Sequence, residues 1–137
     1  MRSIFHLAFH VHDLDAARRF YGGVLGCREG RSTDTWVDFD FFGHQLSLHR
    51  GEPFATTNTG EVGEHRVPMP HFGVLLERPA WKALAERLTA AGVEFVIAPT
   101  IRFEGLPGEQ WTMFFRDPSD NPIEIKGFAS LDTVYAS

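Results

Sequence analysis

The predicted elements occur twice in the same order, and this internal repeat limits the possible fold more than any other feature of the sequence. Each half is predicted to run strand–helix–strand–strand–strand. The leading strands, marked by His6 and His71, lie 65 residues apart, and the glycines that end the two helices, Gly26 and Gly92, lie 66 residues apart. We therefore predict an α+β fold in which two repeated βαβββ modules form a curved, cup-shaped mixed sheet with the helices outside.

Local patterns place these modules along the chain. Residues 4–12 alternate between apolar side chains such as Phe9 on one face and His6 and His10 on the other, as expected of a half-buried strand. Asp13 follows as a typical helix N-cap. The whole chain, 1–137, is predicted to be a single domain with module one at about 4–50, a loop serving as linker or lid at 51–69, module two at about 70–128 and a tail at 129–137.

Charge and cysteine content exclude several classes of function. Thirteen basic and 18 acidic residues give a net charge of −5, without a cluster of Lys or Arg, so nucleic acid and anionic membranes are not expected partners. The single cysteine, Cys27, excludes an internal disulfide and fits a reducing compartment. The amino terminus lacks an apolar signal segment and no apolar run is long enough to span a membrane, so we expect a cytoplasmic protein.

Polar residues at matched positions of the two modules predict a metal site. His6 and His71 lie on the leading strands, and Ser47 and Glu124 lie on the closing strands. If the sheets curl into a cup, these side chains converge inside it. Two imidazoles and one carboxylate form a facial triad that leaves positions open on a divalent metal, whereas serine is a poor ligand. The alternative interpretation is that these are ordinary hydrogen-bonded strand residues.

Three segments carry a resemblance to a known superfamily. Residues 6–26, HLAFHVHDLDAARRFYGGVLG, resemble the opening of vicinal-oxygen-chelate proteins, with a strand His, then Val-x-Asp-Leu, Phe-Tyr and Leu-Gly. Residues 115–125, FRDPSDNPIEI, are similar to the closing Asp-Pro-x-Gly-x-x-x-Glu strand, although Asp120 stands where the family usually has Gly. With residues 70–74, PHFGV, the likeness spans about residues 4–128. The superfamily includes glyoxalase I, fosfomycin-resistance transferases, extradiol dioxygenases and bleomycin-resistance proteins.

The resemblance implies metal ligands at His6, His71 and Glu124. Ser47 occupies the position of the fourth ligand of glyoxalase I, a Glu, and this departure favours the three-ligand dioxygenase or transferase pattern. Lys126 is the only evident cation near the expected site, which counts against a phosphonate substrate. The resemblance favours iron(II) as the divalent metal ion, with manganese, nickel, cobalt or zinc as alternatives.

Dioxygenases of this superfamily also use an acid–base histidine near the metal, and often a tyrosine. Strand parity makes His10 and His49 the candidate catalytic residues, because His10 shares a face with His6 and His49 follows Ser47 by two residues. An imidazole can take up or release a proton near neutral pH. The alternative interpretation is that both face water at the rim. Tyr21 has the spacing of a core residue, so no well-placed catalytic tyrosine is expected.

Two classes of function remain open on the sequence. The first is a metal-dependent enzyme acting on a small substrate, aromatic or not, that chelates through neighbouring oxygens. Dioxygenase chemistry is favoured over glyoxalase-like lyase or isomerase chemistry. The second is a metal-free module that sequesters an apolar or aromatic ligand, as bleomycin-resistance proteins do. The resemblance also implies a homodimer, with each site complete within one chain or shared between two.

Overall fold

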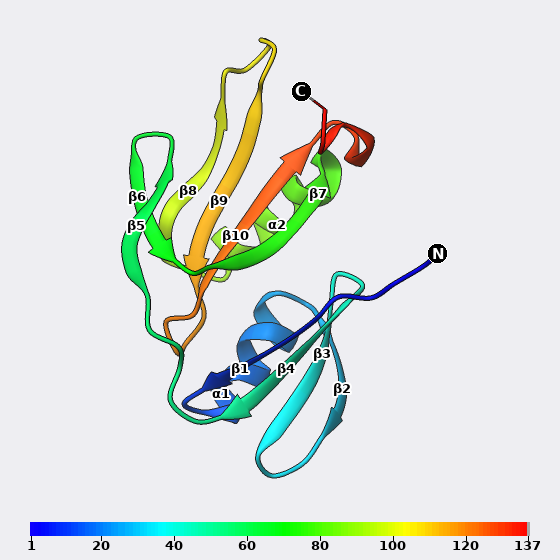
Figure 1. Ribbon diagram of the computed structural model, residues 1–137, viewed down its shortest axis with the longest axis vertical. Helices are drawn as coiled ribbons and strands as arrows, with labels where there is room; N and C mark the ends of the chain where they lie inside the picture. Colours follow the sequence, from blue (N-terminus) through cyan, green and yellow to red (C-terminus); the bar gives the residue numbers. More distant parts are fainter. Residues whose placement is uncertain (137) are drawn as a thin grey trace. The chain divides into compact units, whose positions relative to one another are not determined.

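Two four-stranded sheets and one two-stranded hairpin carry most of the chain (Figure 1). The computed structural model describes residues 1–136, which group into two units. Unit 1 comprises Met1–Ala55 together with the turn Asp117–Asn121, and unit 2 comprises Thr56–Arg116 and the chain from Pro122 onward. Each unit contains one βαβββ run, which confirms the predicted fold class.

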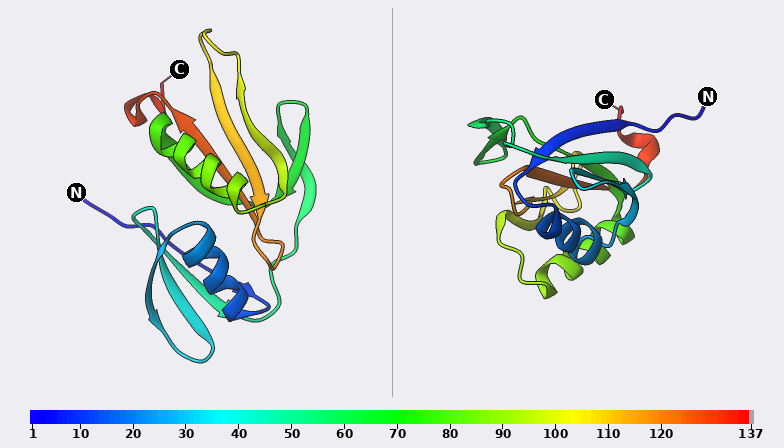
Figure 2. Two further views of the ribbon diagram at one scale, coloured as in Figure 1. Left: turned by 180° about the vertical axis from the view of Figure 1, so that it is seen from behind. Right: turned by 90° about the horizontal axis from the view of Figure 1, so that it is seen from below.

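Unit 1 has strand order β1-β4-β3-β2, with β1 and β4 parallel and the other neighbours antiparallel. A short helix continues directly as a π-helical segment and covers one face of the sheet (Figure 2). Its elements are β1 (His6–Val11), α1 (Leu14–Ala17), η1 (Arg18–Val24), β2 (Arg28–Ser32), β3 (Trp36–Phe41) and β4 (His44–Arg50).

The first strand and its helix follow the predicted pattern. Phe9 and Val11 of β1 are buried, while His6 and His10 on the opposite face are exposed. Asp13 caps α1, because its Oδ1 accepts the backbone N–H groups of the second and third residues that follow. The alternation therefore leaves a polar face on the sheet of unit 1, opposite its helix.

The turn Asp117–Asn121 contributes a buried hydrogen-bond network to unit 1. Tyr21 is fully buried and donates its hydroxyl to Asp117 Oδ2 at 2.7 Å. The backbone N–H groups of Ser119 and Asn121 donate to Asp117 Oδ1. Burial raises the pKa of Asp117, and burial beside this carboxyl raises the pKa of Tyr21 well above its ordinary value. Tyr21 is thus a core residue, as its spacing predicted.

Unit 2 has strand order β7-β10-β9-β8, with β7 and β10 parallel, and the hairpin β5–β6 precedes it. The helix α2 lies across one face of the four-stranded sheet (Figure 2). The elements are β5 (Thr57–Val62), β6 (His65–Met69), β7 (Phe72–Glu77), α2 (Arg78–Ala90), β8 (Phe95–Arg102), β9 (Gln110–Arg116), β10 (Pro122–Phe128) and η2 (Leu131–Thr133).

The two faces of β9 have different surroundings. Trp81 of α2 donates its indole N–H to the carbonyl of Ile125, and its ring packs edge-on against Trp111 with centroids 5.2 Å apart. Trp111 and its alternate neighbours therefore face α2. Thr112 and Phe114 lie on the opposite face, which is the face that carries Glu124.

The segment 51–69 is where the predicted loop is wrong, because most of it forms the hairpin β5–β6. This hairpin buries Val67 in a small apolar cluster with Ile97 and Phe114. Most of the other residues in its strands are polar, and the strands lack the regular alternation that marks a half-buried strand. Among the described residues, no helix has both the length and the apolar character needed to cross a membrane.

Candidate functional site

His71 and Glu124 of unit 2 form a close pair at the start of two parallel strands. His71 directly precedes β7, and Glu124 lies on β10, which pairs with β7. His71 Nε2 is 3.4 Å from Glu124 Oε1, and the two side chains are 21% and 7% exposed. This separation exceeds the usual 2.9–3.0 Å of an N–H···O hydrogen bond. The structure thus brings together two of the three predicted metal ligands.

A second contact fixes the orientation of each member of this pair. His71 Nδ1 lies 2.8 Å from the carbonyl oxygen of Pro68, which can only accept, so Nδ1 is the donor. In the neutral ring Nε2 then carries a lone pair directed at Glu124. Thr112 donates its hydroxyl to Glu124 Oε2 at 2.7 Å, and the Phe114 ring packs edge-on against His71 with centroids 4.9 Å apart. The imidazole of His71 and the carboxylate of Glu124 are therefore both held in place without a metal ion.

The spacing of His71 Nε2 and Glu124 Oε1 fits two ligands of a divalent metal ion. Two ligand atoms about 2.1 Å from one ion, at an angle between 90° and the tetrahedral value, lie about 3.0–3.4 Å apart. The imidazole lone pair and the carboxylate oxygen of the pair have that spacing, and without a proton or a cation between them they repel. A metal-ligating histidine commonly donates its other ring N–H to a backbone carbonyl, as His71 does. Among the described residues of unit 2, no third histidine, cysteine or carboxylate joins the pair.

Gly73 allows the two strands that carry this pair to approach closely. Gly73 is the register partner of Glu124, and a Cβ on it would collide with the Glu124 carbonyl oxygen. Any side chain at this position would push β7 away from β10. The sequence signal was present in the segment PHFGV, but its steric meaning follows only from the register.

The third predicted ligand, His6, lies in unit 1 at the position equivalent to His71. Ser47 is the register partner of Ala8, two residues after His6. In the same way, Glu124 is the register partner of Gly73, two residues after His71. The predicted correspondence between the modules is therefore reproduced in the strand register. The His6 ring contacts Gln45, with Nδ1 2.7 Å from Oε1. A site that combines His6 with the pair in unit 2 stays a prediction.

The two predicted catalytic histidines lie side by side in unit 1. His10 and His49 are register partners on β1 and β4, and both line a pocket of about 380 Å³ with Phe54 and Glu52. Ser47 Oγ lies 3.2 Å from His49 Nε2. The pocket therefore presents two imidazoles beside an aromatic wall. Whether they take part in catalysis stays a prediction.

Gly51 holds the His10 ring close to the backbone. A Cβ at Gly51 would lie 2.7 Å from Cδ2 of the imidazole, closer than two such atoms approach. The ring of His49 packs at a 31° tilt against Trp36, with centroids 6.3 Å apart. The backbone at Gly51 thus restricts the His10 ring, and the Trp36 indole restricts the His49 ring.

A polar pocket in unit 2 contains residues that the sequence analysis missed. It has a volume of about 190 Å³ and is lined in part by Thr100, Arg102 and Thr112. Thr112 is the residue that also bonds Glu124, so the pocket adjoins the His71–Glu124 pair. Lys126, the cation expected near the site, is exposed and is the register partner of Thr112. Arg102 falls outside every recognised motif, and only the pairing of β8 with β9 places it here.

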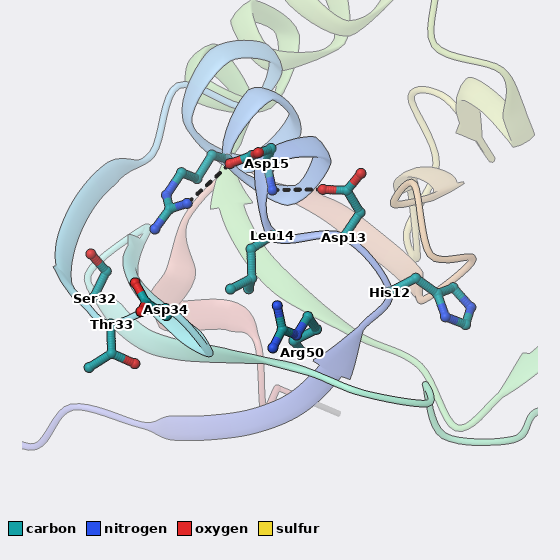
Figure 3. A pocket seen from close by; sticks show the side chains of 9 residues that line it. His12, Asp13, Leu14, Asp15, Ser32, Thr33, Asp34 and Arg50 are labelled. Carbon is teal, nitrogen blue, oxygen red and sulfur yellow. Dashed lines mark hydrogen bonds and ion pairs between the residues drawn. The ribbon is translucent and has the colours of Figure 1, made fainter.

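The largest of these pockets lies in unit 1 near the start of α1, with a volume of about 620 Å³ (Figure 3). Two of its three acidic lining residues, Asp13 and Asp15, already have partners on the protein, and the third is Asp34. Asp13 caps α1, and Asp15 forms an ion pair with Arg18 at 3.3 Å. His12 at its edge binds Ser119 through its backbone N–H. We assign no functional residue to this pocket.

Comparison with known proteins supports the resemblance seen in the sequence. The family model described as the Glyoxalase/Bleomycin resistance protein/Dioxygenase superfamily matches residues 3–125. A crystal structure described as a glyoxalase/bleomycin resistance protein/dioxygenase from Alicyclobacillus acidocaldarius is 32% identical, with a TM-score of 0.78, over 98% of this chain and 97% of that chain.

Two more distant structures share the fold. The fosfomycin resistance protein FosX from Listeria monocytogenes is 18% identical, with a TM-score of 0.66, over 96% of this chain and 97% of its own. Lactoylglutathione lyase from Agrobacterium tumefaciens is 17% identical, with a TM-score of 0.64, over 94% and 96% of the two chains. At these identities the likeness concerns architecture alone.

Proposed function

The chain belongs to the Glyoxalase/Bleomycin resistance protein/Dioxygenase superfamily, and we propose that it is a divalent-metal-dependent enzyme acting on a small substrate with two neighbouring oxygens. His71 and Glu124 would hold the ion, with His6 as the third ligand. The observation that carries the proposal is the 3.4 Å separation of His71 Nε2 and Glu124 Oε1, with each group oriented by a second hydrogen bond. When bound, the ion would supply a Lewis acid with open positions for neighbouring substrate oxygens.

The remaining residues of the proposed site bind the substrate and move protons. His10 and His49 would accept and return a proton of a hydroxyl-bearing substrate, since both rings line one pocket. Phe54 in the same pocket would pack against a flat, apolar ring. This combination supports dioxygenase chemistry on a catechol-like compound, with iron(II) as the metal. Tyr21 takes no part, because it is buried and bound to Asp117.

We propose further that the protein works as a cytoplasmic homodimer. The single cysteine rules out a disulfide within the chain and suits a reducing compartment. His6 would come from the same chain or from a second copy. Mixed His6→Ala and Glu124→Ala chains bind metal only if ligands are exchanged between subunits, and bind none if each chain builds its own site.

The test is metal analysis of protein purified without a chelator. We expect stoichiometric metal in the wild type and its loss in His71→Ala, with His12→Ala as a matched histidine control that keeps it. Circular dichroism verifies that each variant is folded. A wild type without affinity for any of iron(II), manganese, nickel, cobalt or zinc would overturn the proposal and favour the metal-free binding module.

The reaction class is tested separately by anaerobic reconstitution with iron(II) and oxygen-uptake assays against a panel of catechols. We expect uptake that requires both iron and a catechol, and that falls in His10→Ala and His49→Ala without loss of bound iron. Iron-loaded protein without activity on any catechol would reject the dioxygenase assignment and favour lyase or isomerase chemistry.

A further inference from the structure

Three polar side chains form a hydrogen-bonded chain on the exposed face of the unit 1 sheet. His6 Nδ1 lies 2.7 Å from Gln45 Oε1, and Gln45 Nε2 lies 3.2 Å from Asp38 Oδ2. The three residues come from β1, β4 and β3, which are neighbours in the sheet. These hydrogen bonds therefore connect the exposed imidazole of His6 to the carboxylate of Asp38, which is only 8% exposed.

The direction of each proton in this chain follows from the carboxylate at its end. Ionised Asp38 can only accept, so Gln45 must present its NH₂ group to it. The amide oxygen of Gln45 must then face His6, and because that oxygen can only accept, His6 Nδ1 is the donor. The neutral imidazole of His6 consequently carries its proton on Nδ1 and its lone pair on Nε2.

The same tautomer arises in unit 2 by a different route. His71 donates Nδ1–H to the backbone carbonyl of Pro68, whereas His6 donates to a side-chain amide. The residue equivalent to Gln45 in unit 2 is Pro122, because each lies two residues before the closing-strand position, Ser47 or Glu124. Proline has no side-chain acceptor. The two modules thus reach one imidazole state with different partners, which is unexpected for a contact without a role.

We propose that Gln45 and Asp38 are positioning residues that fix the tautomer and ring orientation of His6, so that Nε2 is free to ligate the metal. This inference rests on the proposed metal-dependent function. Asp38 orients the amide of Gln45, and Gln45 orients the imidazole. Partners of this kind commonly change metal affinity by about 10–100-fold when removed. Asp38 is buried, and its Oδ1 has no hydrogen-bond partner among the described residues, so the hydrogen bond from Gln45 to Oδ2 is the contact that orients this carboxylate.

The first test measures the tautomer of His6 in metal-free protein by long-range ¹H–¹⁵N NMR. The wild type should show the Nδ1–H form. Gln45→Met removes the amide oxygen that accepts from His6 and keeps a similar side-chain volume. The neutral His6 ring should then also populate the Nε2–H tautomer, because nothing holds the proton on Nδ1. Gln110→Met, which changes the only other glutamine in the chain, should leave the His6 signals unchanged.

The second test measures affinity for cobalt(II) or zinc by competition with a chelator. Gln45→Met should bind about 10–100-fold more weakly than the wild type, and Gln110→Met should bind equally well. The double variant Asp38→Asn with Gln45→Glu exchanges the amide and the carboxylate. The carboxylate at position 45 still accepts from His6, and the amide at position 38 still donates to that carboxylate. The tautomer of His6 and the metal affinity should therefore stay near wild-type values.

The outcomes separate this inference from the proposed function. A wild type that binds metal, together with an unchanged tautomer or an unchanged affinity in Gln45→Met, would overturn the positioning role alone. Loss of affinity in the double variant equal to that in Gln45→Met would also overturn it. A wild type that binds no metal rejects the proposed function, and the positioning role falls with it.

Discussion

Thr112 shows how one hydroxyl can prepare a carboxylate for ligation. Its side chain is 4% exposed and donates to Glu124 Oε2, which leaves Oε1 directed at His71. The hydrogen bond from Thr112 to Glu124 could not be inferred from the sequence, because a threonine within an apolar strand is expected to be a packing residue. Only the antiparallel register of β9 and β10 brings it to the carboxylate.

We predict that Thr112→Val lowers metal affinity by about 10–100-fold, because Glu124 loses the donor that orients it. Competition with a chelator measures the change. Thr100→Val is the matched control, since Thr100 is the register partner of Thr112 on β8 and should retain wild-type affinity. Equal losses in the two variants would show that Thr112 acts only through general packing.

Strand pairing is the feature that turns separate polar residues into a site. Gly73 is the clearest case, because it leaves room for the backbone of Glu124. We predict that Gly73→Ala destabilises the protein by about 1–3 kcal/mol and also weakens metal binding, since β7 must move away from β10. Gly23→Ala is the control, because a Cβ there meets nothing within 4 Å. Urea unfolding monitored by circular dichroism gives the free energies, and equal stability of the two variants would contradict the prediction.

The turn Asp117–Asn121 gives a prediction about pH. Burial raises the pKa of Asp117 above its ordinary value of 3.8, so the native state keeps this proton at pH values where the unfolded chain has lost it. The stability that Asp117 contributes is therefore complete below its ordinary pKa and declines as the pH rises through the raised native value.

We accordingly predict that the unfolding free energy of the wild type, minus that of Asp117→Asn, falls as the pH rises from about 4 to 7. The asparagine does not titrate, so the difference isolates this carboxyl from all others. Urea unfolding at each pH provides the values. A difference that grows with pH would mean that the hydrogen bonds to the carboxylate outweigh its burial.

How far the sequence predicts the elements depends on how each one buries its side chains. The leading strands β1 and β7, the closing strands β4 and β10 and the start of α1 were predicted, because they occupy matched positions in the repeat, alternate apolar and polar residues or carry a capping signal. The strand β2 was not located, since all five of its residues are exposed and REGRS has no hydrophobic period. The hairpin β5–β6 was missed for the same reason, as only Val67 and its neighbour Pro68 are buried in it.

The prediction of site residues divides in a similar way. His71 and Glu124 were predicted as ligands from matched positions in the repeat; the structure brings them together in unit 2, and their role as ligands stays a prediction. Gln45, Asp38 and Thr112 were not assigned roles near the ligands, because hydrogen bonds across strands depend on register. Alternation reveals the face of a residue but not its neighbour across the sheet.

At the scale of the whole molecule, the proposed metal site should act on stability as well as on chemistry. A ligand that binds only the native state stabilises it by about 2.7 kcal/mol at 100 times its Kd. For a chain of this size we predict a rise in Tm of about 10 °C in calorimetry. His6→Ala, His71→Ala and Glu124→Ala should each lose most of this rise, whereas His12→Ala should keep it. An equal rise in all four variants would place the bound ion elsewhere.

The turn Asp117–Asn121 also has a consequence for the order in which the protein can be built. Tyr21 lies in the first module, yet the acceptor of its buried hydroxyl is made only after the ribosome has passed the third strand of the second module. A nascent chain that ends between the modules therefore has an unsatisfied phenol in its interior. Although the repeat suggests two halves that could exist alone, the first of them cannot be finished until the second is nearly synthesised.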